Sequence, residues 1–248
     1  MTVVAVAISP EELLRRAMNA QDAPSRERLA RKGLATRAPI DRTTNSMLLR
    51  QLYLALFETR RFDEARRVAE SAIELGILRD VMHHDAARAA AAAGDLDDAV
   101  THFRSAARRA PASRRALHWW TLGSLEFHAQ RYDEAAAALE RAMKWATHDR
   151  PLYRAELALV CIAAGERPKD LQKTIDALAS APCGQGYGRF VLGHLAYAAR
   201  EFRAARLYLH AFVDRTEKLA PAAMIALEPE LRMSKATLSK MAPEMANE

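Results

Sequence analysis

Apolar residues recur every three or four positions along most of this 248-residue chain, which is the spacing of one face of an α-helix. The clearest stretch is 119–142, where two short amphipathic helices follow one another. Runs of alternating valine, isoleucine and threonine, which would indicate strands, do not occur. Prolines and glycines fall mostly between the periodic segments, where they end helices. The pattern therefore predicts an all-α protein.

Similar helix pairs recur along the chain with a fixed period. A small residue early in the second helix marks each pair, at Ala65, Ala99, Ala135 and Ala205. The separations are 34, 36 and 70 residues, and 70 is two periods of 35, so one marker is missing near Asp170. A single hairpin cannot bury its apolar face alone, whereas stacked hairpins bury it against each other. Five units in phase therefore predict a helical solenoid.

The units resemble tetratricopeptide repeats, whose pattern is Trp-x2-Leu-Gly-x2-Tyr, then Ala-x3-Phe, then Pro. The unit around residue 123 matches the first helix of this pattern at Trp119, Leu122 and Gly123. Further matches are Ala99, Phe103, Ala106, Pro111, Ala135, Leu139, Ala142, Leu192, Gly193, Ala205 and Leu209. The resemblance implies an all-α, right-handed superhelical solenoid of antiparallel helix hairpins that binds other proteins.

The repeats are expected over residues 46–215, between two segments of different pattern. Their approximate bounds are 46–79, 80–115, 116–150, 151–185 and 186–215. The unit at 151–185 is the weakest match, because Asp170 replaces the alanine. The spacing in residues 1–45 differs, which predicts a divergent N-terminal helical cap or a degenerate repeat. An array needs a terminal element with a polar face, so residues 216–248 are expected to form C-terminal capping helices and a frayed tail.

Charge and cysteine content favour a cytoplasmic protein. The formal net charge of +6 is modest for this length, and it would favour acidic partners. Cys161 lies in an apolar helical run and Cys183 in a loop, so no disulfide is expected. The apolar start at residues 1–8 has no basic segment before it, which argues against a secretory signal. The sequence contains no run of about 18 apolar residues, so no membrane span is predicted.

The resemblance also predicts a binding surface. In tetratricopeptide repeats the first helices line a concave groove that binds an extended peptide or a helix. By their phase, the groove residues are Arg50, Leu54, His84, Arg88, Trp120, Ser124, Phe127, His128, Phe190, His194 and Tyr197. This mixture of apolar, aromatic and donor groups suits an apolar segment with an acidic or carboxylate end. Alternatively, these residues pack on the C-terminal segment of the same chain.

The predicted function is a non-catalytic protein–protein interaction scaffold. Arg50 and Arg88 could hold a carboxylate, although the lysine and asparagine set of the family's carboxylate-clamp members is absent. One alternative is an accessory subunit or chaperone for a secreted or enzymatic partner. A second is a nucleic-acid-associated regulator that uses the arginine run 104–115, which suits a solvated helix face better. Homo-oligomerisation through a terminal repeat also stays open.

No catalytic residue, cofactor or metal site is expected. The sequence shows no Ser-His-Asp, Cys-His or paired-carboxylate arrangement. His83 and His84 are adjacent on a helix and cannot face one ion together, and no second ligand pair lies nearby in the sequence. The glycines at 184–188 follow a helix and lack the lysine and the serine or threonine of a phosphate-binding loop.

Overall fold

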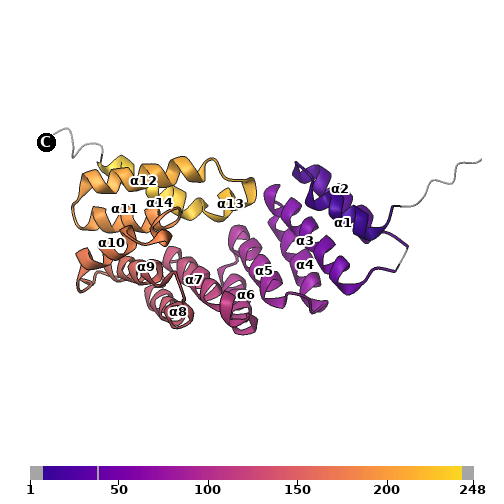
Figure 1. Ribbon diagram of the computed structural model, residues 1–248, viewed down its shortest axis with the longest axis horizontal. Coiled ribbons are helices and arrows are strands. Elements are labelled where there is room, and N and C mark those ends of the chain that lie inside the picture. Colours follow the sequence, from indigo (N-terminus) through magenta and orange to yellow (C-terminus); the bar gives the residue numbers. More distant parts are fainter. Residues whose placement is uncertain (1–7, 38, 242–248) are drawn as a thin grey trace, which may run out of the picture. The chain divides into compact units, whose positions relative to one another are not determined.

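The computed structural model describes residues 8–37 and 39–241, and its regular elements over these residues are all helices (Figure 1). The chain divides into two compact units, Met1–Ala110 and Pro111–Glu248. Each unit is built from helix hairpins, so the predicted all-α array of hairpins is confirmed. The apolar start and the predicted frayed tail at 242–248 lie outside the described residues.

The N-terminal unit contains three hairpins. Its helices are α1 (Pro10–Met18), α2 (Ala23–Leu34), α3 (Arg42–Glu58), α4 (Phe62–Glu74), α5 (Arg79–Ala93) and α6 (Leu96–Arg109). Ser9 and Asp41 cap two of these helices, because their side chains accept backbone N–H groups of the first turn. The α1–α2 hairpin packs directly on α3, so the segment predicted as a cap or degenerate repeat is itself a helix pair.

The C-terminal unit contains three further hairpins and two additional helices. Its elements are α7 (Ala112–His128), α8 (Tyr132–Trp145), α9 (Arg150–Ala163), α10 (Leu171–Ala179), the 3₁₀ turn η1 (Pro182–Gly184), α11 (Gly188–Ala198), α12 (Phe202–Thr216), α13 (Pro221–Ala226) and α14 (Glu228–Met241). The last helix, α14, packs against both α11 and α12. The predicted bounds of the repeats and caps stay predictions.

The repeat is visible in the backbone of five hairpin turns. Each turn contains one residue with a positive φ, between 59° and 90°; these residues are Arg60, Gly94, Gln130, Gly165 and Arg200. In each turn the next N–H donates to the carbonyl five residues earlier at 2.9 Å, which is the bond of a Schellman C-cap. Successive positions lie 34, 36, 35 and 35 residues apart. The turn at Gly165 thus supplies the unit whose alanine marker is missing.

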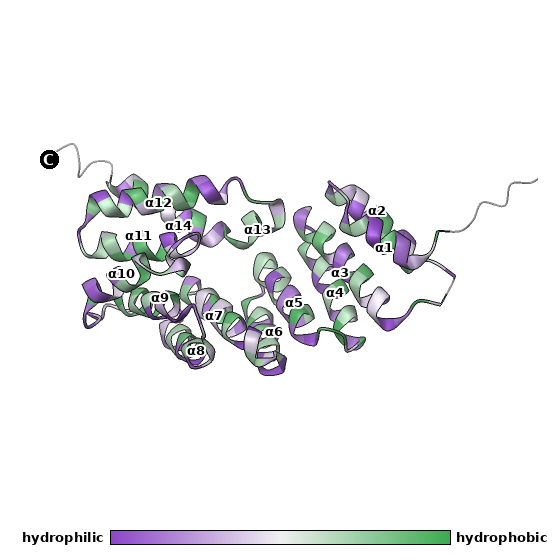
Figure 2. Cartoon of the chain, viewed as in Figure 1, coloured by the Kyte–Doolittle hydropathy of each residue, from purple (hydrophilic) through white to green (hydrophobic). Residues whose placement is uncertain are grey.

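Small residues let the two helices of a hairpin approach closely. A Cβ added at Gly123 would lie 2.8 Å from Cγ of Leu139 on α8, and one at Gly193 would lie 2.5 Å from Leu209 on α12. Ala135 and Ala205 in the facing helices are fully buried. Figure 2 shows hydrophobic and hydrophilic residues sharing most helices, as amphipathic hairpins require. The glycine and alanine positions of the repeat are therefore structural.

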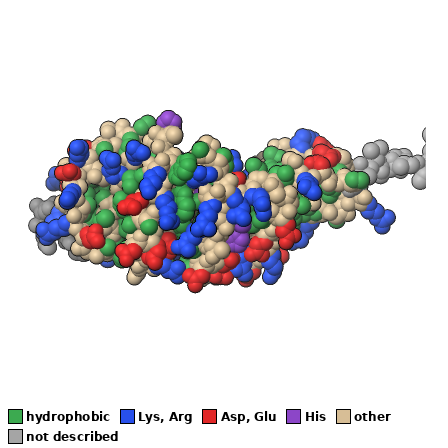
Figure 3. All heavy atoms as spheres, turned by 90° about the horizontal axis from the view of Figure 1, so that it is seen from below, with side chains coloured by type: hydrophobic (Ala, Val, Ile, Leu, Met, Phe, Trp, Pro, Cys, Tyr) green, Lys and Arg blue, Asp and Glu red, His purple; other side chains and the backbone are tan. Residues whose placement is uncertain are grey.

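The surface is charged and mixed in sign. Figure 3 shows both basic and acidic side chains on the face that it draws. In α6, the arginines at 104, 108 and 109 are exposed, whereas the guanidinium of Arg115 in α7 lies 4.3 Å from the ring centroid of Trp145. Within the described residues, the helices are all too short or too polar to cross a membrane.

Candidate functional site

The predicted groove residues of the N-terminal unit are engaged within that unit. Nε of Arg50 donates to Oδ2 of Asp85 at 2.9 Å, and Asp85 is 2% exposed. Burial raises the pKa of Asp85, and Arg50 opposes that rise. The guanidinium of Arg88 lies 4.8 Å from the centroid of an aromatic ring of α3. The ring of His84 packs edge-on against an aromatic ring of α6, and the side chain of Leu54 is half-buried. Arg50 therefore already holds a carboxylate, that of Asp85. As binding residues, the four stay predictions.

The predicted groove residues of the C-terminal unit come together, with one exception. Those that gather are Trp120, Ser124, Phe127 and His128 of α7 with Phe190 and His194 of α11. The ring of Phe190 lies 6.1 Å from that of His128 and 4.7 Å from that of His194. Tyr197 packs instead on Phe202, at 5.9 Å, and lies apart. Phe127 and Phe190 are 5% and 0% exposed, so both also belong to the core.

A buried polar cluster joins these helices. It consists of Trp120, Ser124, Glu156, Tyr187 and Glu230, from α7, α9, the residue before α11, and α14. Nε1 of Trp120 donates to Oε2 of Glu156 at 2.5 Å. The Tyr187 hydroxyl lies 3.4 Å from Oε1 of Glu156 and 3.3 Å from Oε1 of Glu230. Oγ of Ser124 donates to the same Glu230 oxygen at 3.1 Å. A single tyrosine hydroxyl thus bridges two carboxyl groups.

Ionising both carboxyl groups of the polar cluster at once would cost free energy. Glu156 is 0% exposed and Glu230 is 5% exposed, so two charges here would be desolvated and would repel each other. Burial chiefly, and also the charge of Glu230, raises the pKa of Glu156 to about 8, against the hydrogen bonds from Trp120, Tyr187 and Ser124. Glu156 is therefore protonated at neutral pH. Its O–H can then donate to Tyr187, whose own proton is left for Glu230.

Two histidines flank the polar cluster. Nε2 of His128 lies 3.3 Å from Oε1 of Glu230. His194 is 4% exposed, and burial, assisted by His128, lowers its pKa to about 4. His194 is therefore neutral at physiological pH. At neutral pH the protonation of Glu156 therefore differs from that of an exposed glutamate, and His194 stays neutral down to a lower pH than an exposed histidine.

The helix α14 covers this surface with a largely polar face. Its buried residues are Glu230, Ser234, Thr237 and Met241, which lie three or four positions apart on one face. The hydroxyl of Ser234 and Nε2 of His194 are buried without a hydrogen-bond partner among the described residues. An unpaired buried polar group costs about 1–3 kcal/mol. The chain's own C-terminal helix thus occupies the predicted binding surface through an incompletely satisfied interface.

Sequence reasoning missed the two carboxyl groups of the polar cluster. Glu156 could have been noticed, because it is the single acid in the apolar run 152–163. Glu230 had no such signal, since it hydrogen-bonds to Ser124 across 106 positions of sequence. Only the fold brings α14 onto α7.

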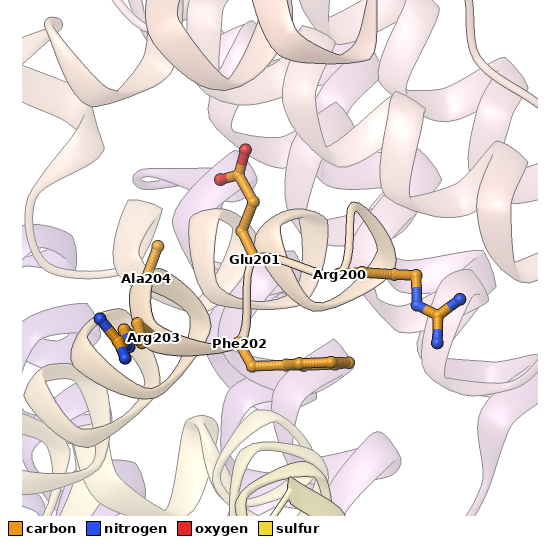
Figure 4. Close-up of a pocket in the computed structure, with 5 residues that line it drawn as sticks. All are labelled: Arg200, Glu201, Phe202, Arg203 and Ala204. Carbon is orange, nitrogen blue, oxygen red and sulfur yellow. The ribbon is translucent and has the colours of Figure 1, made fainter. Parts of the chain in front are cut away.

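A surface hollow lies at the turn between α11 and α12. It has a volume of about 510 Å³, and its lining residues are Arg200, Glu201, Phe202, Arg203 and Ala204. Figure 4 shows the side chains of Arg200, Glu201 and Arg203 pointing in different directions. A small-molecule site needs polar groups that converge, so this hollow is not a candidate.

Comparison with known proteins gives the family of the repeats. A family model described as tetratricopeptide repeat matches residues 84–147. No curated protein matches the chain. Among solved structures, the APC/C hetero-tetramer Cut9-Hcn1 is similar with a TM-score of 0.57 at 18% identity, covering 94% of this chain and 48% of that chain. This chain therefore spans about half the length of that one.

A second similar structure is PilF of Pseudomonas aeruginosa, with a TM-score of 0.53 at 18% identity, covering 82% of this chain and 94% of that chain. At these identities the two structures show a shared fold. Residues 84–147 are therefore tetratricopeptide-repeat sequence within an all-helical hairpin array, and the resemblance seen in the sequence is confirmed.

Proposed function

We propose that the chain is a non-catalytic protein-interaction scaffold, and that the surface formed by α7, α11 and α12 binds an amphipathic helix of a partner protein. Tetratricopeptide repeats and similar repeat structures support an interaction scaffold in general terms. The similar Cut9-Hcn1 structure is a hetero-tetramer, so an array of this fold there forms part of a protein assembly.

One observation carries the choice of surface and of ligand. A helix, α14, already lies on this surface and inserts Glu230 between Ser124, Tyr187 and His128. The surface therefore has the shape and the donors for a helix bearing a carboxylate. An amphipathic helix laid in a groove is a recurrent mode of peptide recognition.

The contacts of α14 describe the partner helix that we expect. The position of Glu230 calls for a carboxylate, and the position of Ser234 one turn later calls for a small residue, because Ser234 is fully buried. A partner that also hydrogen-bonds to His194 would satisfy a group that α14 leaves unpaired. Such a helix would compete with α14 for the same surface.

A synthetic fluorescent peptide with the sequence of residues 228–241 tests this proposal by fluorescence anisotropy. In the full chain, Ser234→Arg should expel α14, because an arginine does not fit at a fully buried position. Ser239→Arg is the matched control, since Ser239 is exposed on the same helix. We expect saturable peptide binding at least tenfold tighter in the first variant, with a loss of helicity no larger than the unfolding of α14 would give. Equal binding by both folded variants would contradict the proposal.

A further inference from the structure

We propose that the N-terminal unit contains a binding site for a divalent transition-metal ion such as Zn²⁺, formed by Glu70 of α4 with Asp98 and His102 of α6. Nε2 of His102 lies 3.6 Å from Oδ1 of Asp98 and 3.8 Å from Oε1 of Glu70. The three ligand atoms all lie within 4.8 Å of one another. Asp98 and His102 are four positions apart, so they point from the same face of α6.

The distances fit a shared ion better than direct hydrogen bonds. A contact of 3.6 Å or more between donor and acceptor is too long for a hydrogen bond. Zn²⁺ binds imidazole nitrogen and carboxylate oxygen at about 2.0–2.2 Å, which places tetrahedral ligand atoms roughly 3.3 Å apart. The two contacts of His102, at 3.6 Å and 3.8 Å, exceed that separation by about 0.3 Å and 0.5 Å, and all three ligand atoms lie within 4.8 Å of one another. One imidazole and two carboxylates are also a donor set that Zn²⁺ accepts.

Neighbouring side chains hold two of the three proposed ligands by contacts to the atoms that do not face the ion. Nδ1 of His102 lies 3.0 Å from Nδ1 of His83, so the second ring nitrogen of the ligand has a partner and Nε2 is left for the ion. Arg66 binds Oδ2 of Asp98 at 3.2 Å, which leaves Oδ1 for the ion. The side chain of Glu70 is 44% exposed, so an ion can enter and water can complete its coordination.

The site joins two successive hairpins. Glu70 belongs to the hairpin of α3 and α4, and Asp98 and His102 belong to that of α5 and α6. A bound ion would link the second helices of these hairpins and stabilise their stacking. The sequence alone argued against a metal site, because His83 and His84 are adjacent on a helix and cannot face one ion together. In the fold, His83 faces His102 of another helix, and His84 does not take part.

Isothermal titration of the full chain with ZnCl₂ tests the site. We expect one saturable site in the unmodified chain, its loss in His102→Gln, and weakening of at least tenfold in Glu70→Gln. The matched controls are His210→Gln and Glu74→Gln, which change exposed residues outside the cluster. Both variants should bind Zn²⁺ as the unmodified chain does. His83→Gln should weaken binding roughly 10- to 100-fold, as loss of an outer-shell partner does.

Two results would overturn the site. One is the absence of saturable Zn²⁺ binding by the unmodified chain. The other is equal binding by Glu70→Gln and the unmodified chain, which would place the ion elsewhere. The side chain of Glu70 is half-exposed, so its substitution does not endanger the fold. Zn²⁺ should also raise the thermal midpoint of the unmodified chain and leave that of Glu70→Gln nearly unchanged.

Discussion

Replacing Glu156 with glutamine should remove a loss of stability that the unmodified protein shows between pH 6.5 and 8.5. Glu156 has a pKa near 8 in the folded chain against 4.5 for an exposed glutamate. The folded state therefore holds a proton that the unfolded state has already lost, so stability falls as the pH rises from about 4.5 toward 8 and levels off above that. Glutamine resembles the protonated carboxyl group and does not titrate.

The magnitude follows from the two pKa values. Between pH 6.5 and 8.5, the proton that only the folded state retains makes the free energy of unfolding fall by about 2 kcal/mol as the pH rises. The lowered pKa of His194, about 4, acts in the opposite direction, because only the unfolded state takes up its proton. That effect adds less than about 1 kcal/mol over this interval, because the unfolded histidine is already largely neutral there. The expected net loss is therefore about 1–2 kcal/mol, whereas the variant, which keeps His194, should lose no stability and gain slightly.

Tryptophan fluorescence during urea unfolding is a suitable assay. Trp119, Trp120 and Trp145 all belong to the C-terminal unit, so the signal reports the unit that contains Glu156. Linear extrapolation at several pH values gives the free energy of unfolding. An identical pH dependence in the variant would refute the reasoning. So would a variant several kcal/mol less stable at pH 6.5, because it would show that the folded chain needs the ionised carboxylate.

Three further predictions concern the packing and the turns, each measured by urea unfolding followed by circular dichroism. Gln130→Gly should stabilise the chain by about 1 kcal/mol, because glycine adopts the positive φ at this position without strain. Gly94→Ala in the equivalent turn should destabilise the chain by a similar amount. A change of stability with the same sign in both variants would contradict this reasoning. Gly123→Ala should cost about 1–3 kcal/mol through overpacking against α8, and no loss would mean that the hairpin can widen. Arg50→Met should cost about 1–3 kcal/mol by leaving Asp85 buried without its partner, and Asp85→Asn in the same chain should recover part of that loss.

The repeat itself could be predicted from the sequence because its signals are local. Gly123 and Ala135 recur at fixed offsets, since each hairpin must bring two backbones close together. The residues with positive φ in the turns were harder to predict. Glycine favours a positive φ, so Gly94 and Gly165 can be recognised in the sequence, whereas Arg60 and Gln130 adopt this conformation although their residue types do not favour it. Their conformation is imposed by the C-cap hydrogen bonds.

The chemistry of the two candidate sites could be predicted only in part, because it depends on contacts between distant segments. Trp120 and Ser124 were found by their phase on a helix. Glu230 reaches them only when α14 folds back, and no periodicity encodes that step. In the same way, His83 and His102 lie 19 residues apart on different helices, so their pairing is invisible before the hairpin forms.

The central claim is that α14 is an exchangeable occupant of a helix-binding surface. Hydrogen–deuterium exchange of the unmodified chain, with and without excess ¹⁵N-labelled peptide 228–241, tests it most directly, because mass separates the resident helix from the added one. If the surface binds helices, the added peptide should speed exchange in the resident α14 and leave α7 protected. Unchanged exchange in the resident α14 at saturating peptide would contradict the claim.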